Sequence, residues 1–375
     1  MSEALQGVLD GMLGRRGVHH AVLAVESGDR SLSWVGAGGD ADSSGRSMTT
    51  ETPYFIASVT KLYYAAIVVR LAERGEIDLD ASMASCLPGE LTERLHVLGG
   101  VDRTAEISVR NLATHTSGLP DYIEDKPKSG KRLVERILAE GDRGVTVAEV
   151  CEIARTGLTP HFRPQRLGGD GRVKARYSDT NFALLRAIIE AVTGSAWPDA
   201  LRTELLEPLG LRHTWVPGSE PLEVPAEQEV ALWAGQETIA LPKFLAAVGD
   251  LYSTVPDQIG FIRALVSGTA FDDPDTARTM WSGWNTLAFD PTTPRLPGWP
   301  IEYGFGTMRF GLPRWLTPLR AMPPFEGHSG STGCWLYYSP DLDVYTCGAV
   351  DQIEAGALPY RVLPKLMAIL TEPRG

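Results

Sequence analysis

The sequence PYFIASVTK (residues 53–61) runs directly into LYYAAIVV (residues 62–69). Residues 62–69 are all apolar or aromatic, and a helix without a polar face lies buried inside a protein. The stretch therefore predicts a buried helix that begins deep in the molecule. Ser58 and Lys61 stand three residues apart, which places both side chains on one face of a first helical turn.

This pair of residues fits nucleophilic chemistry. A serine hydroxyl attacks when a nearby base removes its proton, and lysine is such a base when its ammonium form is disfavoured. Burial and the positive end of the helix dipole both disfavour an ammonium, so we expect a lowered pKa for Lys61. The helix start also offers an unpaired N–H group for an oxyanion. The same letters also fit a serine N-cap followed by a solvated lysine, because Ser-x-x-Lys is a common match.

Length and composition describe a folded protein. The chain has 375 residues, 43% of them hydrophobic and 22% charged, which fits one large domain or two interleaved ones. A net charge of −12 argues against a general nucleic-acid binder. Residues 1–17 carry Glu3 and Asp10 and lack the apolar core of a secretory signal, and no run approaches a membrane span. We therefore expect a cytoplasmic protein with no membrane partner.

The cysteines and histidines show no zinc-ligand spacing, so we expect no metal. A symmetric hairpin around residues 339–342 would set Cys334 opposite Cys347. These two cysteines could form a disulfide or could be two small apolar residues in a sheet. A reducing compartment favours the second interpretation.

The order of elements predicts an α+β fold. A helix at residues 3–15 and strands at 20–25 and 32–35 open the chain, and three strands between residues 303 and 350 close it before a helix at 359–370. We expect a central antiparallel sheet flanked by helices and built from both chain ends, with a largely helical domain inserted. The predicted domains are residues 1–75 with 300–375, and residues 76–299 with a loop insert at 122–176.

Three features of the middle of the chain have two interpretations each. His115, after a short helix capped by Ser108, is either catalytic or a loop histidine bonded to its own turn. Aromatic residues at 281–299 either line an apolar acyl pocket or pack as core; they are Trp281, Trp284 and Trp299. Basic residues before Tyr177 form either a positive rim or a solvated loop; they are Lys126, Lys128, Lys131, Arg132, His161, Arg163, Arg166, Arg172, Lys174 and Arg176.

Two further polar motifs accompany Ser58. Tyr177-Ser178-Asp179 precedes a second apolar helix at residues 182–192. Residues 327–333, GHSGSTG, invite comparison with a Gly-x-Ser-x-Gly nucleophile elbow, but serine occupies the second glycine position and no helix follows. A nucleophile elbow is therefore excluded.

The three motifs in this order, Ser58-x-x-Lys61, Tyr177-Ser178-Asp179 and His328-Ser329-Gly330, resemble the serine hydrolases of the β-lactamase and penicillin-binding superfamily. The pattern is most similar to the branch with class C β-lactamases, family VIII carboxylesterases, D-aminopeptidases and D-alanyl-D-alanine carboxypeptidases. The resemblance covers most of the chain.

The resemblance implies a role for each motif. Ser58 would be the acyl-accepting nucleophile and Lys61 its base, and Tyr177 a second proton-transfer group with a pKa lowered by neighbouring cations. His328 would contact Tyr177 and a substrate carboxylate. The N–H groups of Ser58 and Ser331 would form the oxyanion hole. Substrate contacts would come from Asp179, Asn181, Ser329 and Gly330.

Two positions depart from that family pattern. Asp179 stands where asparagine is usual, and an ionised carboxylate accepts but does not donate and repels a substrate carboxylate. His328 stands where β-lactamases commonly have lysine, and neutral imidazole binds an acidic group less firmly. Both argue against β-lactam hydrolysis. An alternative alignment makes Ser178 the proton relay of a Ser-Asp-Asn motif, with Thr180 in the last place.

The sequence thus predicts a serine hydrolase that cleaves ester or small amide bonds through a seryl acyl-enzyme, carboxylesterase-like and without a cofactor. Alternatives are a D-amino-acid peptidase or amidase, in which Asp179 attracts a substrate ammonium, a β-lactamase, and an acyltransferase on the same scaffold. A binding module that kept only the fold is disfavoured because Ser58, Lys61 and Tyr177 are all present.

Overall fold

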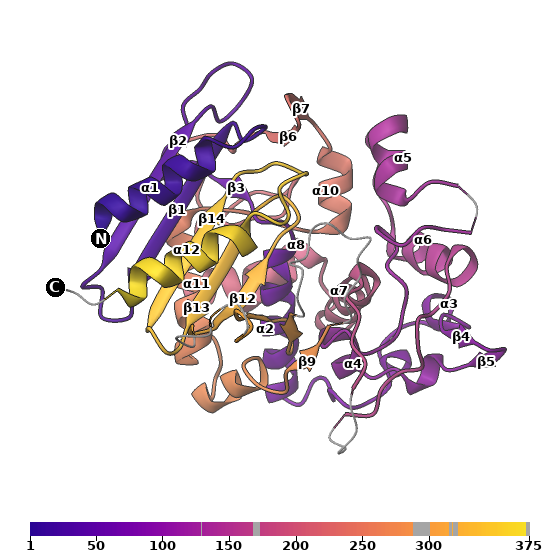
Figure 1. Cartoon of the computed structure of the whole chain (residues 1–375). Helices are drawn as coiled ribbons and strands as arrows, with labels where there is room; N and C mark the ends of the chain where they lie inside the picture. The colour runs from indigo at the N-terminus through magenta and orange to yellow at the C-terminus, as the bar shows by residue number, and fades with distance from the viewer. Residues whose placement is uncertain (129, 168–172, 288–300, 315–316, 318–321, 373–375) are drawn as a thin grey trace.

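The computed structural model describes residues 1–128, 130–167, 173–287, 301–314, 317 and 322–372. Within them, eight antiparallel strands form one sheet in the order β2-β1-β14-β13-β12-β11-β10-β9. Both ends of the chain contribute neighbouring strands, so the predicted fold class is confirmed (Figure 1). The strands are β1 (His20–Ser27), β2 (Ser33–Gly39), β9 (Asn285–Thr286), β10 (Glu302–Tyr303), β11 (Met308–Phe310), β12 (Phe325–Ser329), β13 (Trp335–Ser339) and β14 (Val344–Ala349).

Helices cover both faces of the sheet. The terminal helices α1 (Ser2–Leu13) and α12 (Pro359–Thr371) lie side by side over one face, where their apolar stripes share a core with residues of β1 and β13 (Figure 1). On the other face, α2 (Lys61–Glu73) contacts β12, and α11 (Val255–Ser267) contacts β13 and β14. The sheet is therefore the middle layer of three.

The remaining helices form the inserted part beside α2. Two of these helices lie within residues 122–176, so the segment that was expected to be a loop insert is partly helical. The division of the chain into the two predicted domains stays a prediction. These helices are α3 (Gly89–Thr92), α4 (Val109–Ala113), α5 (Leu133–Glu140), α6 (Val147–Glu152), α7 (Asp179–Thr193), α8 (Trp197–Leu201), α9 (Glu207–Leu209) and α10 (Pro242–Val248). Short strand pairs are β3 (Tyr54–Phe55) with β8 (Tyr252–Ser253), β4 (Val97–Leu98) with β5 (Val101–Asp102), and β6 (Leu232–Ala234) with β7 (Glu237–Ile239).

Helix α2 is buried as its sequence predicts. Every side chain from Lys61 to Val69 is buried, because sheet, α7 and the loop before β11 enclose the helix on all sides. Gly75, with φ 74°, follows its end in the left-handed conformation that favours glycine. Gly306, with φ 70°, packs against α2 so closely that a Cβ atom there would overlap the Cβ of Ala65.

The predicted pairing of Cys334 with Cys347 is wrong. In the β13–β14 hairpin, Leu336 is the residue opposite Cys347, and Ser339 pairs with Val344. The turn between them has four residues, including Asp343 in the left-handed conformation, rather than the two that were expected. Both cysteines are buried free thiols.

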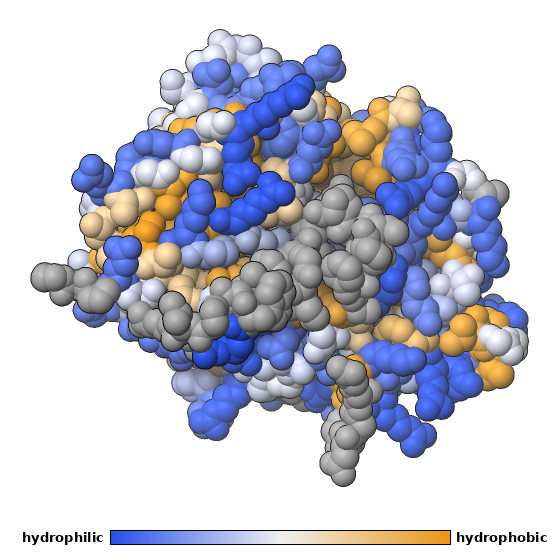
Figure 2. Space-filling view, viewed as in Figure 1, coloured by the Kyte–Doolittle hydropathy of each residue, from blue (hydrophilic) through white to orange (hydrophobic). Residues whose placement is uncertain are grey.

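In the part of the chain that the structure describes, none of the helices has the length and apolar character needed to cross a bilayer. The surface seen in Figure 2 is largely polar, with apolar residues over α1 and α12 and again near α5 and α10.

We expect Gly306→Ala to destabilise the fold more than Gly75→Ala. Both substitutions place a side chain at positive φ, which costs roughly 1–2 kcal/mol. No atom lies within 4 Å of a Cβ at residue 75, whereas at residue 306 overpacking against α2 adds about 1–3 kcal/mol. Urea unfolding of both variants measures the difference, and equal losses would contradict the close packing on α2.

Candidate active site

Ser58 lies in a tight turn, and backbone contacts hold the residues that lead into it. Residues Ala57–Thr60 form a 3-10 turn that leads into α2, so Ser58 precedes the α-helix instead of lying within its first turn. Phe55 pairs with Tyr252, and the N–H of Ile56 donates to the carbonyl of Leu251 at 2.9 Å. Ala57 has φ 42°, a costly conformation for alanine that surrounding structure must impose. The turn thereby presents a half-buried Ser58 at the end of a rigid approach.

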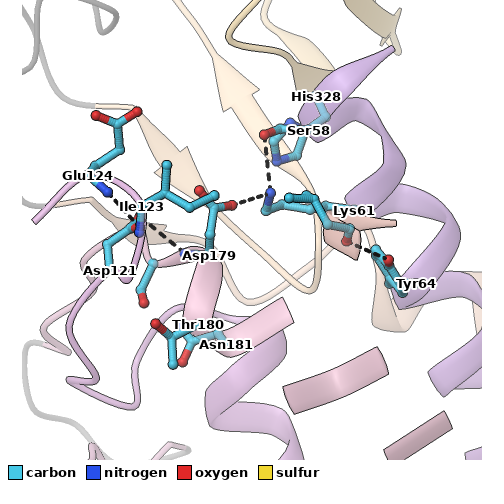
Figure 3. Close-up of polar contacts among 12 residues, drawn as sticks. Ser58, Lys61, Tyr64, Asp121, Ile123, Glu124, Asp179, Thr180, Asn181 and His328 are labelled. Atoms are coloured by element: carbon cyan, nitrogen blue, oxygen red, sulfur yellow. Dashed lines mark hydrogen bonds and ion pairs between the residues drawn. The ribbon is translucent and has the colours of Figure 1, made fainter. Parts of the chain in front are cut away.

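Lys61 links Ser58 to Asp179, the first residue of α7 (Figure 3). Its Nζ atom donates to Ser58 Oγ at 3.1 Å and lies 2.6 Å from Asp179 Oδ1. Burial alone would lower the pKa of Lys61, but the carboxylates of Asp179 and Asp250 outweigh it and raise that pKa above its usual range. The expected lowered pKa is therefore wrong, because the sequence did not reveal an ion-pair partner.

Tyr177 completes the group around Ser58. Its ring lies 5.1 Å from Lys61 Nζ, and Tyr177 lines the same pocket as Ser58. Burial, and then the charge of Asp179, raise the pKa of Tyr177 well above its usual value. The expected lowering is wrong, since one cation beside the ring does not compensate for burial near a carboxylate. Tyr177 is held as a phenol.

The rest of the second motif serves to fix this group. Ser178 is buried and its hydroxyl donates to the carbonyl of Pro120 at 2.9 Å, which removes the alternative in which Ser178 is the proton relay. Asn181 is also fully buried, and its amide contacts Ser117 and His115. The expectation that Asn181 contacts substrate is therefore wrong: the two residues from Asp179 to Asn181 rotate the side chain by about 200°, to the core side of α7.

His115 binds the second motif instead of its own turn. Its Nδ1 atom accepts from the N–H of Ser178 at 3.2 Å and from the Asn181 amide at 2.9 Å, so Nε2 carries the proton. Its ring packs 4.4 Å from the rings of both Tyr177 and Tyr303. Burial, together with Lys61, lowers the pKa of His115 well below its usual value. A neutral His115 thus orients Tyr177 from behind.

His328 does not reach the pocket. Its Nδ1 donates to the carbonyl of Ser329 at 2.7 Å, and its Nε2 accepts from the Tyr303 hydroxyl at 3.1 Å. Burial, together with Lys61, lowers the pKa of His328 to about 3. The expected contact with a substrate carboxylate is wrong, because His328 is fully buried in β12 while its neighbours Ser329 and Gly330 line the pocket.

The two predicted oxyanion donors lie on the same pocket wall. Ser58 and Ser331 both line it, and neither backbone N–H has an acceptor among the residues that the structure describes. Gly330 permits this approach, since a Cβ atom there would overlap Cys334 Sγ and press on Ala57. Cys334 Sγ in turn contacts the carbonyl of Ile56 at 3.0 Å. The oxyanion-hole role of these N–H groups stays a prediction.

The pocket above Ser58 has a volume of about 510 Å³ and two contrasting sides. Carboxylates of Asp121, Asp179 and Asp250 lie on one side. Asp121 is the buried support of this group, since its carboxylate accepts the N–H groups of Ile123, Glu124 and Asp179 (Figure 3). The apolar side is formed by Phe55, Ile123, Val134, Leu138, Leu232, Ile239, Leu241, Phe244, Leu245, Val248, Met308 and Ile353.

This lining corrects two expectations. Trp281 and Trp284 do not line the pocket; Trp281 packs against the core and Trp284 stacks on Arg309, while Trp299 lies outside the described residues. Apolar side chains of α5 and α10 occupy that role instead. The basic residues at the rim are Lys126, Arg132 and Arg176, but Glu124 and Asp125 stand among them, so the rim is of mixed charge.

A buried histidine–aspartate contact supports the turn before Ser58. His20 Nε2 lies 3.2 Å from Asp351 Oδ2, and both side chains are fully buried. Asp351 Oδ1 accepts the N–H of Phe55 at 3.1 Å, and His20 Nδ1 donates to the carbonyl of Asp40 at 3.0 Å. The pair therefore joins β1, the end of β14 and the segment that carries the nucleophile. Burial raises the pKa of Asp351, and His20 opposes that shift.

The fold and this arrangement match one family. The family described as Beta-lactamase matches residues 5–350. The chain belongs to the β-lactamase family. This family member is 27% identical to Penicillin-binding protein 4 of Amycolatopsis lactamdurans over 249 residues, which are 63% of this chain and 56% of that protein. It is 30% identical to Esterase EstB of Burkholderia gladioli over 226 residues, 59% of this chain and 53% of that one.

A solved structure, the D-stereospecific amidohydrolase from Streptomyces sp., superimposes on this β-lactamase-family protein with a TM-score of 0.70 at 25% identity, covering 97% of each chain. The matches to the first curated relatives span between about a third and just over half of those proteins' length.

Sequence reasoning missed Asp250, Asp351, His20 and the orienting role of His115. Asp250 lies in a short run with no charged neighbour, so no local pattern places it beside Lys61. His20 and Asp351 are at opposite ends of the chain and meet only because β1 and β14 pair.

We expect Asp351→Ala to destabilise the protein by about 3–5 kcal/mol, because it leaves His20 and the Phe55 N–H buried without a partner. Asp351→Asn should cost less, since asparagine tolerates the φ of 44° and keeps an acceptor for Phe55. Denaturant unfolding of both variants checks this order. The same cost for both would show that the pair does not support the turn.

Proposed function

We propose that this protein is a serine hydrolase that cleaves ester or small amide bonds through an acyl-enzyme on Ser58, with carboxylesterase activity as its main form. The observation that carries the proposal is the position of Ser58 Oγ, 3.1 Å from Lys61 Nζ, on the wall of a pocket of about 510 Å³ that Tyr177 also lines. Nucleophile and proton-transfer groups within reach of each other are what acyl-enzyme catalysis requires.

The steps follow from these positions. Ser58 loses its proton toward Lys61 and Oγ bonds to the substrate carbonyl carbon, while the N–H groups of Ser58 and Ser331 hold the oxyanion. The tetrahedral intermediate collapses, and the phenol of Tyr177 gives its proton to the leaving oxygen or nitrogen. Water then attacks the acyl-enzyme and gives one proton to the phenolate left on Tyr177, and Ser58 Oγ takes back the proton that it gave up as it leaves the acyl carbon. An alcohol or amine in place of water would give acyl transfer.

The pocket favours an apolar acyl group without a carboxylate. Leucine, isoleucine, phenylalanine and valine side chains around α10 provide apolar surface for such a group. Asp179 and Asp250 repel a carboxylate, and His328 is too buried to bind one. These features argue against β-lactams and against peptides with a free carboxyl end.

We expect a fluorophosphonate probe to label wild type but not Ser58→Ala, with intact mass as the readout. Wild type should turn over p-nitrophenyl butyrate and leave nitrocefin intact, since only the second carries a carboxylate beside its scissile bond. An unlabelled wild type without turnover of either compound would overturn the proposal.

A second candidate is an amidase for substrates with an ammonium group, such as D-aminoacyl amides. The observation that favours it is Asp250, a carboxylate on the pocket wall with no hydrogen-bond partner among the described residues. Asp179 is less suited to this role because Lys61 already occupies one of its oxygens. The Streptomyces structure named above is that of a D-stereospecific amidohydrolase.

Burial raises the pKa of Asp250 to about 6. Its charge is therefore present above pH 6 and lost below it, while a substrate α-amino group stays protonated to about pH 8. We expect kcat/KM for D-phenylalanine amide, relative to p-nitrophenyl butyrate, to rise between pH 5 and 7 in wild type. Asp250→Asn should abolish that rise, and a rise that persists in the variant would exclude Asp250 as the ammonium site.

A further inference from the structure

The groups around Ser58 pose a problem for the removal of its proton. Lys61, the nearest nitrogen, is an ammonium paired with a carboxylate, and an ammonium has no lone pair to accept a proton. Tyr177 is a phenol, because burial and Asp179 raise its pKa. His328 Nε2 is occupied by the Tyr303 hydroxyl, and His328 is not among the residues that line the pocket. In the resting site, therefore, neither Lys61 nor Tyr177 is in the form that accepts a proton.

One carboxylate is connected to Ser58 by a continuous line of contacts. Ser58 Oγ, Lys61 Nζ and Asp179 Oδ1 follow one another at 3.1 Å and 2.6 Å (Figure 3). The Lys61 side chain is 4% exposed and that of Asp179 is 18% exposed, so little water competes for either contact. Residues from the 3-10 turn, α2 and α7 thus form a short path of polar contacts that ends on a proton acceptor.

We propose that Asp179 is the final proton acceptor for Ser58, acting through Lys61. The inference rests on the proposed function. As Ser58 Oγ bonds to the carbonyl carbon, its proton passes to Lys61 Nζ while a Lys61 proton passes to Asp179 Oδ1. Lys61 is an ammonium before and after the step, and Asp179 becomes a neutral acid. The proton returns along the same path when the acyl-enzyme is hydrolysed, or leaves through Tyr177 with the leaving group.

The surroundings of Asp179 fit such a role. Asp179 is the first residue of the 15-residue helix α7, so it lies at the positive end of the helix dipole. Its own N–H donates to Asp121 Oδ2 at 3.1 Å, which fixes its backbone. Asp121 and Asp250 place two further carboxyl groups on the wall of the same pocket. Lys61, Tyr177, Tyr122 and Tyr303 are further titratable groups close enough to interact with its charge.

The substitution Asp179→Asn separates this relay from direct catalysis by Lys61. Asparagine keeps the shape and an acceptor for Lys61 Nζ, but it takes no proton. The relay predicts a fall in kcat for p-nitrophenyl butyrate of about 100-fold or more, with KM nearly unchanged. If Lys61 is the direct base, loss of the neighbouring carboxylate lowers its pKa, and activity at pH 7 is retained or rises with a more acidic pH optimum. That outcome would overturn the relay.

Two further measurements keep the test independent of folding. Asp179→Glu restores a carboxylate, so it should recover part of the kcat that Asp179→Asn loses. Its activity should again decrease at acid pH, and a purely structural role for Asp179 would not reproduce that pH dependence. If Asp179→Asn does not fold, the solvent isotope effect on wild-type acylation across mixtures of H2O and D2O decides: two protons in transfer support the relay, and one excludes it.

The two proposals fail in different ways. Absence of Ser58 labelling and of turnover in wild type would remove the proposed function itself. A labelled, active wild type whose Asp179→Asn variant keeps its kcat would remove only the relay.

Discussion

The burial of one ammonium group organises this protein around its site. Lys61 begins a helix that is enclosed by the sheet on one side and α7 on the other, so its charge has almost no contact with water. A buried charge is tolerated only when it is paired and hydrogen-bonded, and Asp179 provides that pairing at 2.6 Å. The ion pair therefore requires α2 and α7, which are far apart in sequence, to dock with their first turns facing each other.

The segment before Ser58 has a complementary constraint, which is backbone strain. Ala57 and Asp351 are both at positive φ, and the N–H of Phe55 connects them through the Asp351 carboxylate. Such conformations persist only where neighbouring contacts over-determine them. Here β8, the buried His20–Asp351 pair and the close approach of Gly330 all act on four consecutive residues. The nucleophile is positioned by the sheet and by both chain ends.

Local patterns were sufficient for the fold and for the identity of the motifs. The apolar run after Lys61 predicted a buried helix, and strands at both chain ends predicted a shared sheet, because each follows from the chain's own periodicity. Properties that depend on a distant partner were not predictable. The sequence did not reveal that Asp179 faces Lys61, so the expected pKa directions of Lys61 and Tyr177 were both wrong. It also did not determine the length of the β13–β14 turn, which decides which residue pairs with Cys347. The catalytic and binding roles of Ser58, Lys61, Tyr177 and Ser331 stay predictions.

The carboxylate at position 179 connects the chemistry of the site with its choice of substrate. The family resemblance expects asparagine there, whose amide donates to a substrate carbonyl and leaves the lysine without a counter-charge. An aspartate removes that donor, holds Lys61 as an ammonium and, with Asp121 and Asp250, adds a third acidic side chain to one side of the pocket. Proton acceptance and repulsion of anionic substrates then have the same cause. The proposed substrates, with neutral or cationic acyl groups, follow from these carboxylates and from the apolar side chains of α10 on the pocket wall.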